Sequence, residues 1–159
     1  MAPVITSKIH WLHIPIDAGK TWRGKRIFGD HKTVRGFLVG ILFAVIIALI
    51  QWQLAQKNII PFPYFSDVRT FLLYGFLSGF GALAGDAIES FVKRQIGITS
   101  GNPFVPFDQI DYIVGFLLST SFLIHWDIPS IILLLTAGLI LNPLTNFIAY
   151  ALKIKNTYW

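Results

Sequence analysis

One stretch of this chain, residues 36–56, contains no charged side chain. It is apolar almost throughout, and glutamines appear only near its end, at Gln51, Gln53 and Gln56. Its length matches the ~20 residues that an α-helix needs to cross the hydrocarbon core of a bilayer. A helix is one of the few structures that satisfy all their backbone hydrogen bonds in lipid. We therefore expect an all-α integral membrane protein.

The overall composition supports this class. Of the 159 residues, 54% are hydrophobic and 13% are charged, whereas soluble domains carry about 25% charged residues. The length fits a single domain, residues 1–159. The absence of cysteine excludes disulfides, thiolate metal sites and thiol catalysis. A net charge of +5 would also fit a nucleic-acid partner, but membrane proteins carry excess Lys and Arg in cytoplasmic loops, so we expect none.

Further apolar stretches predict a bundle of about four transmembrane helices. The expected spans are roughly 36–55, 70–92, 112–126 and 129–151. Eleven of the thirteen Lys and Arg residues lie before the first span, between the second and third, or after the last. The positive-inside rule assigns these segments to the cytoplasm. We expect a multi-pass protein of the cell (plasma) membrane whose charged, catalytic loops face the cytoplasm.

Six charged side chains gather in residues 85–111. One face of the second span carries polar residues at helical spacing, namely Asp86, Glu89, Ser90 and Lys93. Asp86 lies ~24 Å along the helix from Thr70, which is still inside a ~30 Å hydrocarbon core. An unpaired carboxylate at that depth costs on the order of 3 kcal/mol. Asp86 is therefore expected to face a polar cavity, a partner or an ion.

Two further carboxylates, Asp108 and Asp111, are three residues apart, on one face of the next helix. Asp108 is also placed to cap that helix, which alone is worth ~1 kcal/mol, but capping does not explain Asp111. Mg²⁺ binds through one or two carboxylates together with substrate phosphates. We therefore expect Asp86, Asp108 and Asp111 to be metal-binding, catalytic carboxylates, with Lys93 beside them as a catalytic cation.

The loop of residues 17–35 is basic and interrupted by glycines. One interpretation is contact with anionic lipid headgroups, worth ~1 kcal/mol for each basic residue. The other is a cradle for a polyphosphate, in which glycines let backbone N–H groups approach and cations neutralise charge. Composition favours neither. The candidate nucleotide- and phosphate-binding cations here are Arg23, Lys25, Arg26, Lys32 and Arg35.

Carboxylates and cations at a cytoplasmic membrane surface are typical of metal-assisted phosphoryl or nucleotidyl transfer. Proton transport is the competing class, since intramembrane carboxylates also form proton relays. A relay needs polar steps across the whole bilayer, and the opposite half of this chain is nearly free of ionisable residues. The sequence favours an enzyme over a non-catalytic membrane transport or scaffold protein.

The motif GDAIESFVKRQIG, followed by PFDQID, resembles the signature of CDP-diglyceride synthetases. The whole chain is similar to the CDP-archaeol synthase family, whose elements stand here as IDAG from Ile16, WRGKR from Trp22, GDHKTVRG from Gly29 and PLTNFIAY from Pro143. This resemblance covers nearly all of residues 16–159. The family normally has one more spanning helix before the IDAG element, and we expect this chain to start too late to hold it.

The resemblance implies a CTP-dependent cytidylyltransferase. CTP and a digeranylgeranylglyceryl phosphate would give CDP-archaeol and pyrophosphate, with Mg²⁺ required. By the same resemblance Asp86 and Asp108 would hold the metal and Asp111 would support it. Lys93, Arg94, Ser90 and the basic loop, including Thr33 of its Lys-Thr element, would bind phosphates. The lipid chains would lie in a lateral groove between spans. The alternative within this chemistry is a CDP-diacylglycerol synthase that acts on phosphatidic acid.

Overall fold

The computed structural model describes residues 14–62 and 64–153. These residues form four α-helices, which are α2 (Val34–Gln56), α3 (Val68–Gln95), α4 (Phe107–Thr120) and α5 (Ile128–Ala151). Ahead of α2 lies a small antiparallel hairpin of strands β1 (Thr21–Trp22) and β2 (Lys25–Arg26). The predicted helical class is confirmed. The hairpin was not predicted from the sequence, which indicated only a glycine-rich loop at this position. The expectation that the chain starts too late to hold a further helix ahead of the IDAG element concerns residues 1–13, which lie outside those described.

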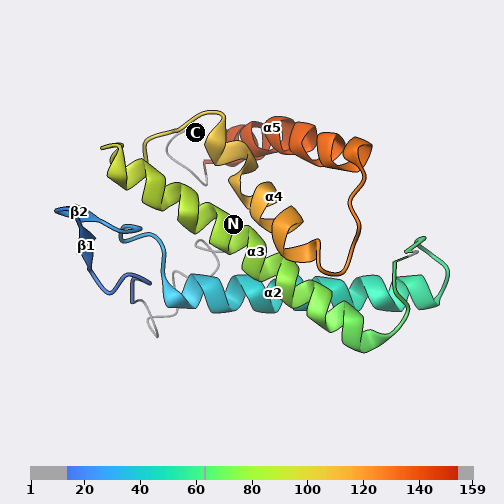
Figure 1. Ribbon diagram of the computed structural model, residues 1–159. Helices are drawn as coiled ribbons and strands as arrows, with labels where there is room; N and C mark the ends of the chain where they lie inside the picture. Colours follow the sequence, from blue (N-terminus) through green and yellow to red (C-terminus); the bar gives the residue numbers. More distant parts are fainter. Residues whose placement is uncertain (1–13, 63, 154–159) are drawn as a thin grey trace.

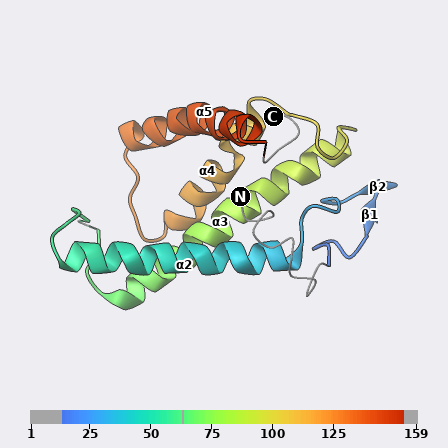
Figure 2. The same ribbon diagram turned by 180° about the vertical axis from the view of Figure 1, so that it is seen from behind.

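Helix α3 runs through the middle of the molecule, between α2 and α4 (Figure 1). The hairpin, the first turn of α2 and the last turn of α3 lie at one end, and the connection from α2 to α3 lies at the other (Figure 1, Figure 2). The basic loop and the charged end of α3 are therefore neighbours, as the sequence predicts.

Among the described residues, three helices, α2, α3 and α5, are long and apolar enough to cross a membrane. In the most apolar part of α2 and of α5 only 6% of residues are buried inside the protein, against 28% for α3. The exposed surfaces of α2 and α5 are rich in Leu, Ile and Phe. Such surfaces are suited to contact with lipid chains, because a bilayer core is itself apolar. Helix α3 is the central span of the bundle.

Helix α4 differs from the expected span of 112–126. It begins at Phe107, ends at Thr120 and has 14 residues, so it is about 21 Å long and shorter than a ~30 Å core. Hydropathy missed its beginning because the first turns contain Asp108 and Asp111. Its N-cap residue is Pro106 and no side chain caps the helix, so the alternative role of Asp108 as a helix cap is excluded. After the helix the chain turns, and the indole N–H of Trp126 donates to the Thr120 hydroxyl at 3.1 Å.

Small residues let α3 approach both neighbours closely. Against α2, a Cβ added at Gly75 would lie 2.8 Å from the Cβ of Ala48. Against α4, a Cβ added at Gly81 would lie 2.4 Å from the carbonyl oxygen of Gly115, and one added at Gly85 would lie 2.2 Å from the carbonyl oxygen of Asp111. Side chains at these positions would push the helices apart. The glycines therefore bring the first turns of α4 against the charged end of α3.

Helix α5 supports α4 from the other side. A Cβ added at Gly138 would lie 2.8 Å from the carbonyl oxygen of Gln109. The side-chain amide of Asn142 donates to the carbonyl oxygen of Asp108 at 2.8 Å. These contacts hold the first turn of α4, with its two carboxylates, between α3 and α5.

We expect Gly81→Ala to destabilise the protein, because the new methyl group would overlap the Ser119 hydroxyl and the Gly115 carbonyl. Overpacking typically costs ~1–3 kcal/mol, more than the ~1 kcal/mol that alanine gains in helix propensity. Thermal unfolding in detergent measures the change.

Gly40→Ala is the matched control. Its methyl group would meet only the end of the flexible Leu83 side chain, at 2.9 Å, so its stability should equal or exceed that of the parent. If Gly81→Ala is as stable as Gly40→Ala, the close crossing of α3 and α4 is wrong.

Candidate active site

Three carboxylates from two helices meet where α3 and α4 cross. Asp86 and Glu89 lie one turn apart on α3, and Asp111 comes from α4. One oxygen from each of the three lies within 4.8 Å of the others. We call this group the carboxylate cluster. Carboxylate oxygens at such spacing suit a hard divalent cation such as Mg²⁺, so the residues present fit a metal ion.

Asp108 lies next to this cluster and is held by other partners. The Lys93 ammonium is 2.7 Å from Asp108 Oδ1 and 3.4 Å from Glu89 Oε1. The backbone N–H of Phe104 also donates to the Asp108 carboxylate. Of the predicted metal ligands, the structure brings Asp86 and Asp111 into one cluster, with Glu89 as the third member and Asp108 beside it. The sequence placed Glu89 on the same helix face as Asp86 but gave it no role.

A polar pocket of about 390 Å³ opens beside the cluster. Its charged lining comprises Lys32, Asp86, Lys93 and Asp108, and its side-chain amides include Asn102, Gln109 and Asn142. The Lys32 ammonium forms an ion pair with Asp86, which joins the N-terminal loop to α3. Lysines and carboxylates in one pocket can bind a phosphate group and a metal ion together.

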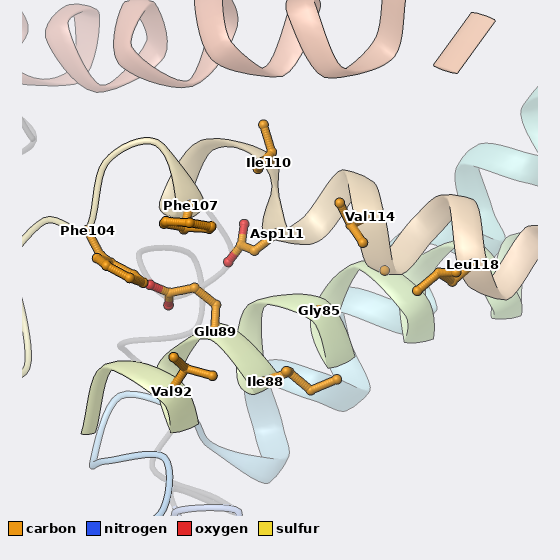
Figure 3. Close-up of a pocket in the computed structure, with 11 residues that line it drawn as sticks. Gly85, Ile88, Glu89, Val92, Phe104, Phe107, Ile110, Asp111, Val114 and Leu118 are labelled. Atoms are coloured by element: carbon orange, nitrogen blue, oxygen red, sulfur yellow. The ribbon is translucent and has the colours of Figure 1, made fainter. Parts of the chain in front are cut away.

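An apolar pocket of about 500 Å³ lies on the other side of the cluster. Ile88 and Val92 of α3 form one wall, and Val114 and Leu118 of α4 form the other (Figure 3). Glu89 and Asp111 also line this pocket and supply its charged groups, and they lie beside Phe104 and Phe107 (Figure 3). Asp86 lines the polar pocket instead. The carboxylate cluster therefore marks the junction of the two pockets.

A third pocket, of about 340 Å³, lies between the hairpin and the end of α3. Its cations are Lys25, Arg26 and Arg94, so we call it the basic pocket. Of the candidate phosphate-binding cations, only Lys32 and Lys93 line the polar pocket. The sequence grouped all these cations together, and the structure divides them between two pockets.

Four further candidate phosphate-binding residues lie outside the polar pocket. The Thr33 hydroxyl accepts the N–H of Gly36 at 3.1 Å and caps α2. Arg35 and Ser90 are buried, and Arg23 is exposed in the hairpin turn. The lining of the polar pocket includes none of these four residues.

Asp17, to which the sequence interpretation gave no role, organises the basic loop. Its buried carboxylate accepts the backbone N–H groups of Gly19, Phe28 and Gly29 at 2.9–3.1 Å, and the Arg26 guanidinium lies at 2.9 Å. Burial would raise the pKa of Asp17, but the hydrogen bonds from Phe28, Arg26 and the two glycines hold it at about 2. A carboxylate at the start of a loop of glycines and basic residues was the available sequence signal.

The organised loop is also attached to α3. The Lys25 ammonium donates to the carbonyl oxygen of Gln95 at 2.6 Å, at the end of the helix. The rings of Phe28 and Phe91 meet edge to face, with centroids 6.5 Å apart. With the ion pair between Lys32 and Asp86, these contacts fix the loop beside the carboxylate cluster.

Comparison with known proteins gives a consistent result. A model of the CarS-like CDP-archaeol synthase family matches residues 4–159. The CDP-archaeol synthase of Pyrococcus furiosus is 39% identical over 148 residues, which cover 91% of this chain and 83% of the relative. That of Methanopyrus kandleri is 38% identical over 148 residues, which cover 91% and 79%. A solved structure described as an intramembrane enzyme for archaeal membrane lipids biosynthesis is similar with a TM-score of 0.72 and 29% identity, covering 92% of this chain and 87% of that one.

The role of Asp17 predicts a pH dependence of the loop. Its folded-state pKa of about 2 lies below its ordinary value of 3.8. The ionised carboxylate therefore stabilises the loop above about pH 4, by on the order of 2 kcal/mol, and this contribution disappears as the pH falls towards about 2. We expect Asp17→Asn to lower the hydrogen-exchange protection of the Phe28 and Gly29 amides about 30-fold at neutral pH. The difference in protection between Asp17→Asn and the parent should disappear as the pH falls towards about 2.

Asp30→Asn is the control, because Asp30 pairs with the same Arg26 guanidinium but its side chain is 77% exposed. Exposed ion pairs contribute ~0–1 kcal/mol, so protection should change little. An equal loss of protection in both variants would contradict the assigned role of Asp17.

Proposed function

The chain belongs to the CDP-archaeol synthase family, and we propose that the carboxylate cluster, between the polar and apolar pockets, is where its reaction takes place. The protein is a membrane-embedded cytidylyltransferase of archaeal lipid biosynthesis. It transfers CMP from CTP to digeranylgeranylglyceryl phosphate and gives CDP-archaeol and pyrophosphate. The observation that carries the proposed location is the cluster itself, where a polar, lysine-containing pocket meets an apolar one.

The polar pocket is proposed to take the triphosphate of CTP. Lys32 and Lys93 both line it, and ammonium groups form strong hydrogen bonds to phosphate oxygens. Both already contact carboxylates, Lys32 at Asp86 and Lys93 at Asp108. Asp108 is in this proposal a positioning residue that holds the Lys93 ammonium toward the pocket. The pocket volume of about 390 Å³ is within the range of roughly 300–1,000 Å³ that is usual for small-molecule sites.

The apolar pocket is proposed to take the lipid next to its phosphate. Ile88 and Leu118 line it and are 64% and 67% exposed, so the pocket opens on the surface that would face lipid. Isoprenoid chains could thus remain in the bilayer while the phosphate reaches Glu89 and Asp111. A lipid that never leaves the membrane avoids the cost of exposing its chains to water, ~0.8 kcal/mol for each CH₂ group.

In the proposed reaction the nucleophile is an oxygen of the lipid phosphate. This oxygen forms a bond to the α-phosphorus of CTP, the bond from that phosphorus to the oxygen that bridges to the β-phosphorus breaks, and pyrophosphate leaves. The second pKa of a phosphate monoester is about 6, so the nucleophile is mostly ionised at neutral pH. The protein then needs no general base, and its residues act by positioning the two phosphates and neutralising charge.

Asp86, Glu89 and Asp111 are proposed to hold Mg²⁺. The ion would neutralise the oxygens of the triphosphate as charge moves onto pyrophosphate. The fit rests on a purely oxygen donor set from two helices, within 4.8 Å, which is the chemistry that Mg²⁺ prefers. Lys32 and Lys93 keep this concentration of carboxylates partly compensated in charge.

The proposed location is the cytoplasmic side of the plasma membrane. The hairpin, the basic loop and the end of α3 carry most of the Lys and Arg and lie at one end of the molecule (Figure 1). The positive-inside rule favours the cytoplasm for that end, which is also the compartment that contains CTP.

We expect Asp86→Asn, Glu89→Gln and Asp111→Asn each to reduce turnover more than about 100-fold, because each removes a charged ligand of the metal. Asp108→Asn should cost about 10- to 100-fold, since it acts through Lys93. Pyrophosphate release from labelled CTP, with Mg²⁺ and digeranylgeranylglyceryl phosphate, measures the effect. A parallel assay with phosphatidic acid tests the ester-lipid alternative.

Asp67→Asn is the control, since Asp67 caps the opposite end of α3 and asparagine caps equally well. Its turnover should match that of the parent. Normal turnover in both Asp86→Asn and Asp111→Asn would overturn the proposed site, and normal turnover in Glu89→Gln alone would remove Glu89 from it.

The apolar pocket gives a second test. Val114→Trp would fill part of it, so we expect the KM for the lipid to rise about tenfold or more while the KM for CTP stays the same. Leu133→Trp is the control, because Leu133 is 69% exposed on α5 and does not line this pocket. Equal changes in the two KM values, or none, would contradict the assignment of this pocket to the lipid.

A further inference from the structure

The basic pocket is separate from the polar pocket. Lys93 and Arg94 are neighbours on α3, yet Lys93 lines the polar pocket and Arg94 the basic one. The connection after α3 is divided in the same way, because Ser100 lines the basic pocket and Gly101 the polar one. The last turn of α3 and this connection thus form a wall between the two. Groups in the basic pocket are therefore available to a different ligand.

Hydrogen-bond donors converge where two glycines leave the basic pocket open. A Cβ added at Gly29 would lie 3.7 Å from Arg94 Nε and 3.9 Å from the Ser100 hydroxyl. A Cβ added at Gly97 would lie 4.0 Å from the Lys25 ammonium. Both glycines have positive φ, 96° and 90°, which other residues rarely adopt. The residues that carry this guanidinium, this ammonium and this hydroxyl all line the basic pocket.

One of these donors has no hydrogen-bond partner in the part of the chain that the structure describes. The Nε of Arg94 is buried and has no hydrogen-bond acceptor among the described residues, whereas its Nη1 donates to the carbonyl oxygen of Ile98. A buried polar group without a partner typically costs ~1–3 kcal/mol, and more when charged. Structures retain such a group when a ligand or water accepts its hydrogen bond.

Two of the three cations in the basic pocket form no ion pair with a carboxylate of the described residues. Asp30 pairs with Arg26 at 2.7 Å, and Arg26 also binds Asp17. Within the described part of the chain, the hydrogen bonds from Lys25 and Arg94 go to neutral carbonyl oxygens, those of Gln95 and Ile98. Two cations therefore remain for an anion. Paired cationic donors with a hydroxyl are the usual recognition set for phosphate oxygens.

We propose that the basic pocket is a second oxyanion site, which binds a phosphate group away from the carboxylate cluster. Lys25, Arg94 and Ser100 donate to its oxygens, and Gly29 and Gly97 give it room. The group is either free, as in inorganic pyrophosphate, or the headgroup phosphate of an anionic lipid. The pocket of about 340 Å³ accommodates either. The site stands on its own geometry and does not depend on the proposed reaction.

The test measures pyrophosphate binding by calorimetry on the purified full chain in detergent, with EDTA and at low ionic strength. Ser100→Asp introduces a negative charge at an exposed loop position of this pocket and should weaken binding at least about tenfold. Lys20→Gln makes the same change in net charge at an exposed position that does not line the pocket. It should change the Kd less than about twofold.

Two further variants keep the result decisive. Arg94→Gln should also weaken binding about tenfold, which covers the case in which Ser100→Asp fails to fold, as judged by circular dichroism. Lys32→Met removes a cation of the polar pocket and should leave this binding unchanged. If Lys32→Met weakens it and Ser100→Asp and Arg94→Gln do not, the anion binds in the polar pocket and the proposal is overturned.

Nanodiscs distinguish the two sources of the phosphate. If a headgroup fills the pocket, anionic lipid should weaken pyrophosphate binding by the parent protein and abolish its difference from Ser100→Asp. If the natural ligand is a free anion, the difference should persist in anionic and in zwitterionic nanodiscs. Equal affinity of the parent and both pocket variants in zwitterionic nanodiscs would show that no such site exists.

Discussion

The close crossing of α3 and α4 sets the position of the whole candidate site. A side chain at Gly85 would collide with the backbone of Asp111, so the absence of one lets a carboxylate of α4 approach Asp86 and Glu89. Closely packed helices with small interfacial residues are common in membranes, where no hydrophobic effect drives helices together. Here the same packing has a chemical result. It places three carboxylates at the junction of a polar and an apolar pocket.

Hydropathy was sufficient to predict the long helices, because α2, α3 and α5 are each long and apolar enough to cross a membrane. It failed at α4, whose first turns contain Asp108 and Asp111 and whose length depends on contacts with α3 and α5. The hairpin was missed for a related reason. Its strands have two residues each, too few for an alternating pattern, and the loop around it is ordered by Asp17 instead.

Helical spacing predicted that Asp86, Glu89 and Lys93 share a face, and the structure agrees. It did not predict which of them approaches Asp111, because that depends on the crossing of two helices. Glu89 was therefore passed over, while Asp108 was preferred although Lys93 and the Phe104 N–H hold it beside the cluster. Basic residues were the hardest to assign. Their charge favours contact with any phosphate group, so the sequence does not tell one site from another. Lys93 and Arg94 are neighbours in the sequence, and only the structure shows that they line different pockets.

The split origin of the carboxylate cluster has a thermodynamic consequence. Because its members come from two helices, a cation that binds all three also joins α3 to α4, as a crosslink would. A ligand that binds only the folded form raises its stability by RT ln(1 + [L]/Kd). Ion concentration and helix association are thereby linked variables. A divalent cation bound to these three carboxylates would therefore stabilise the packing of α3 against α4 as well as serve the chemistry.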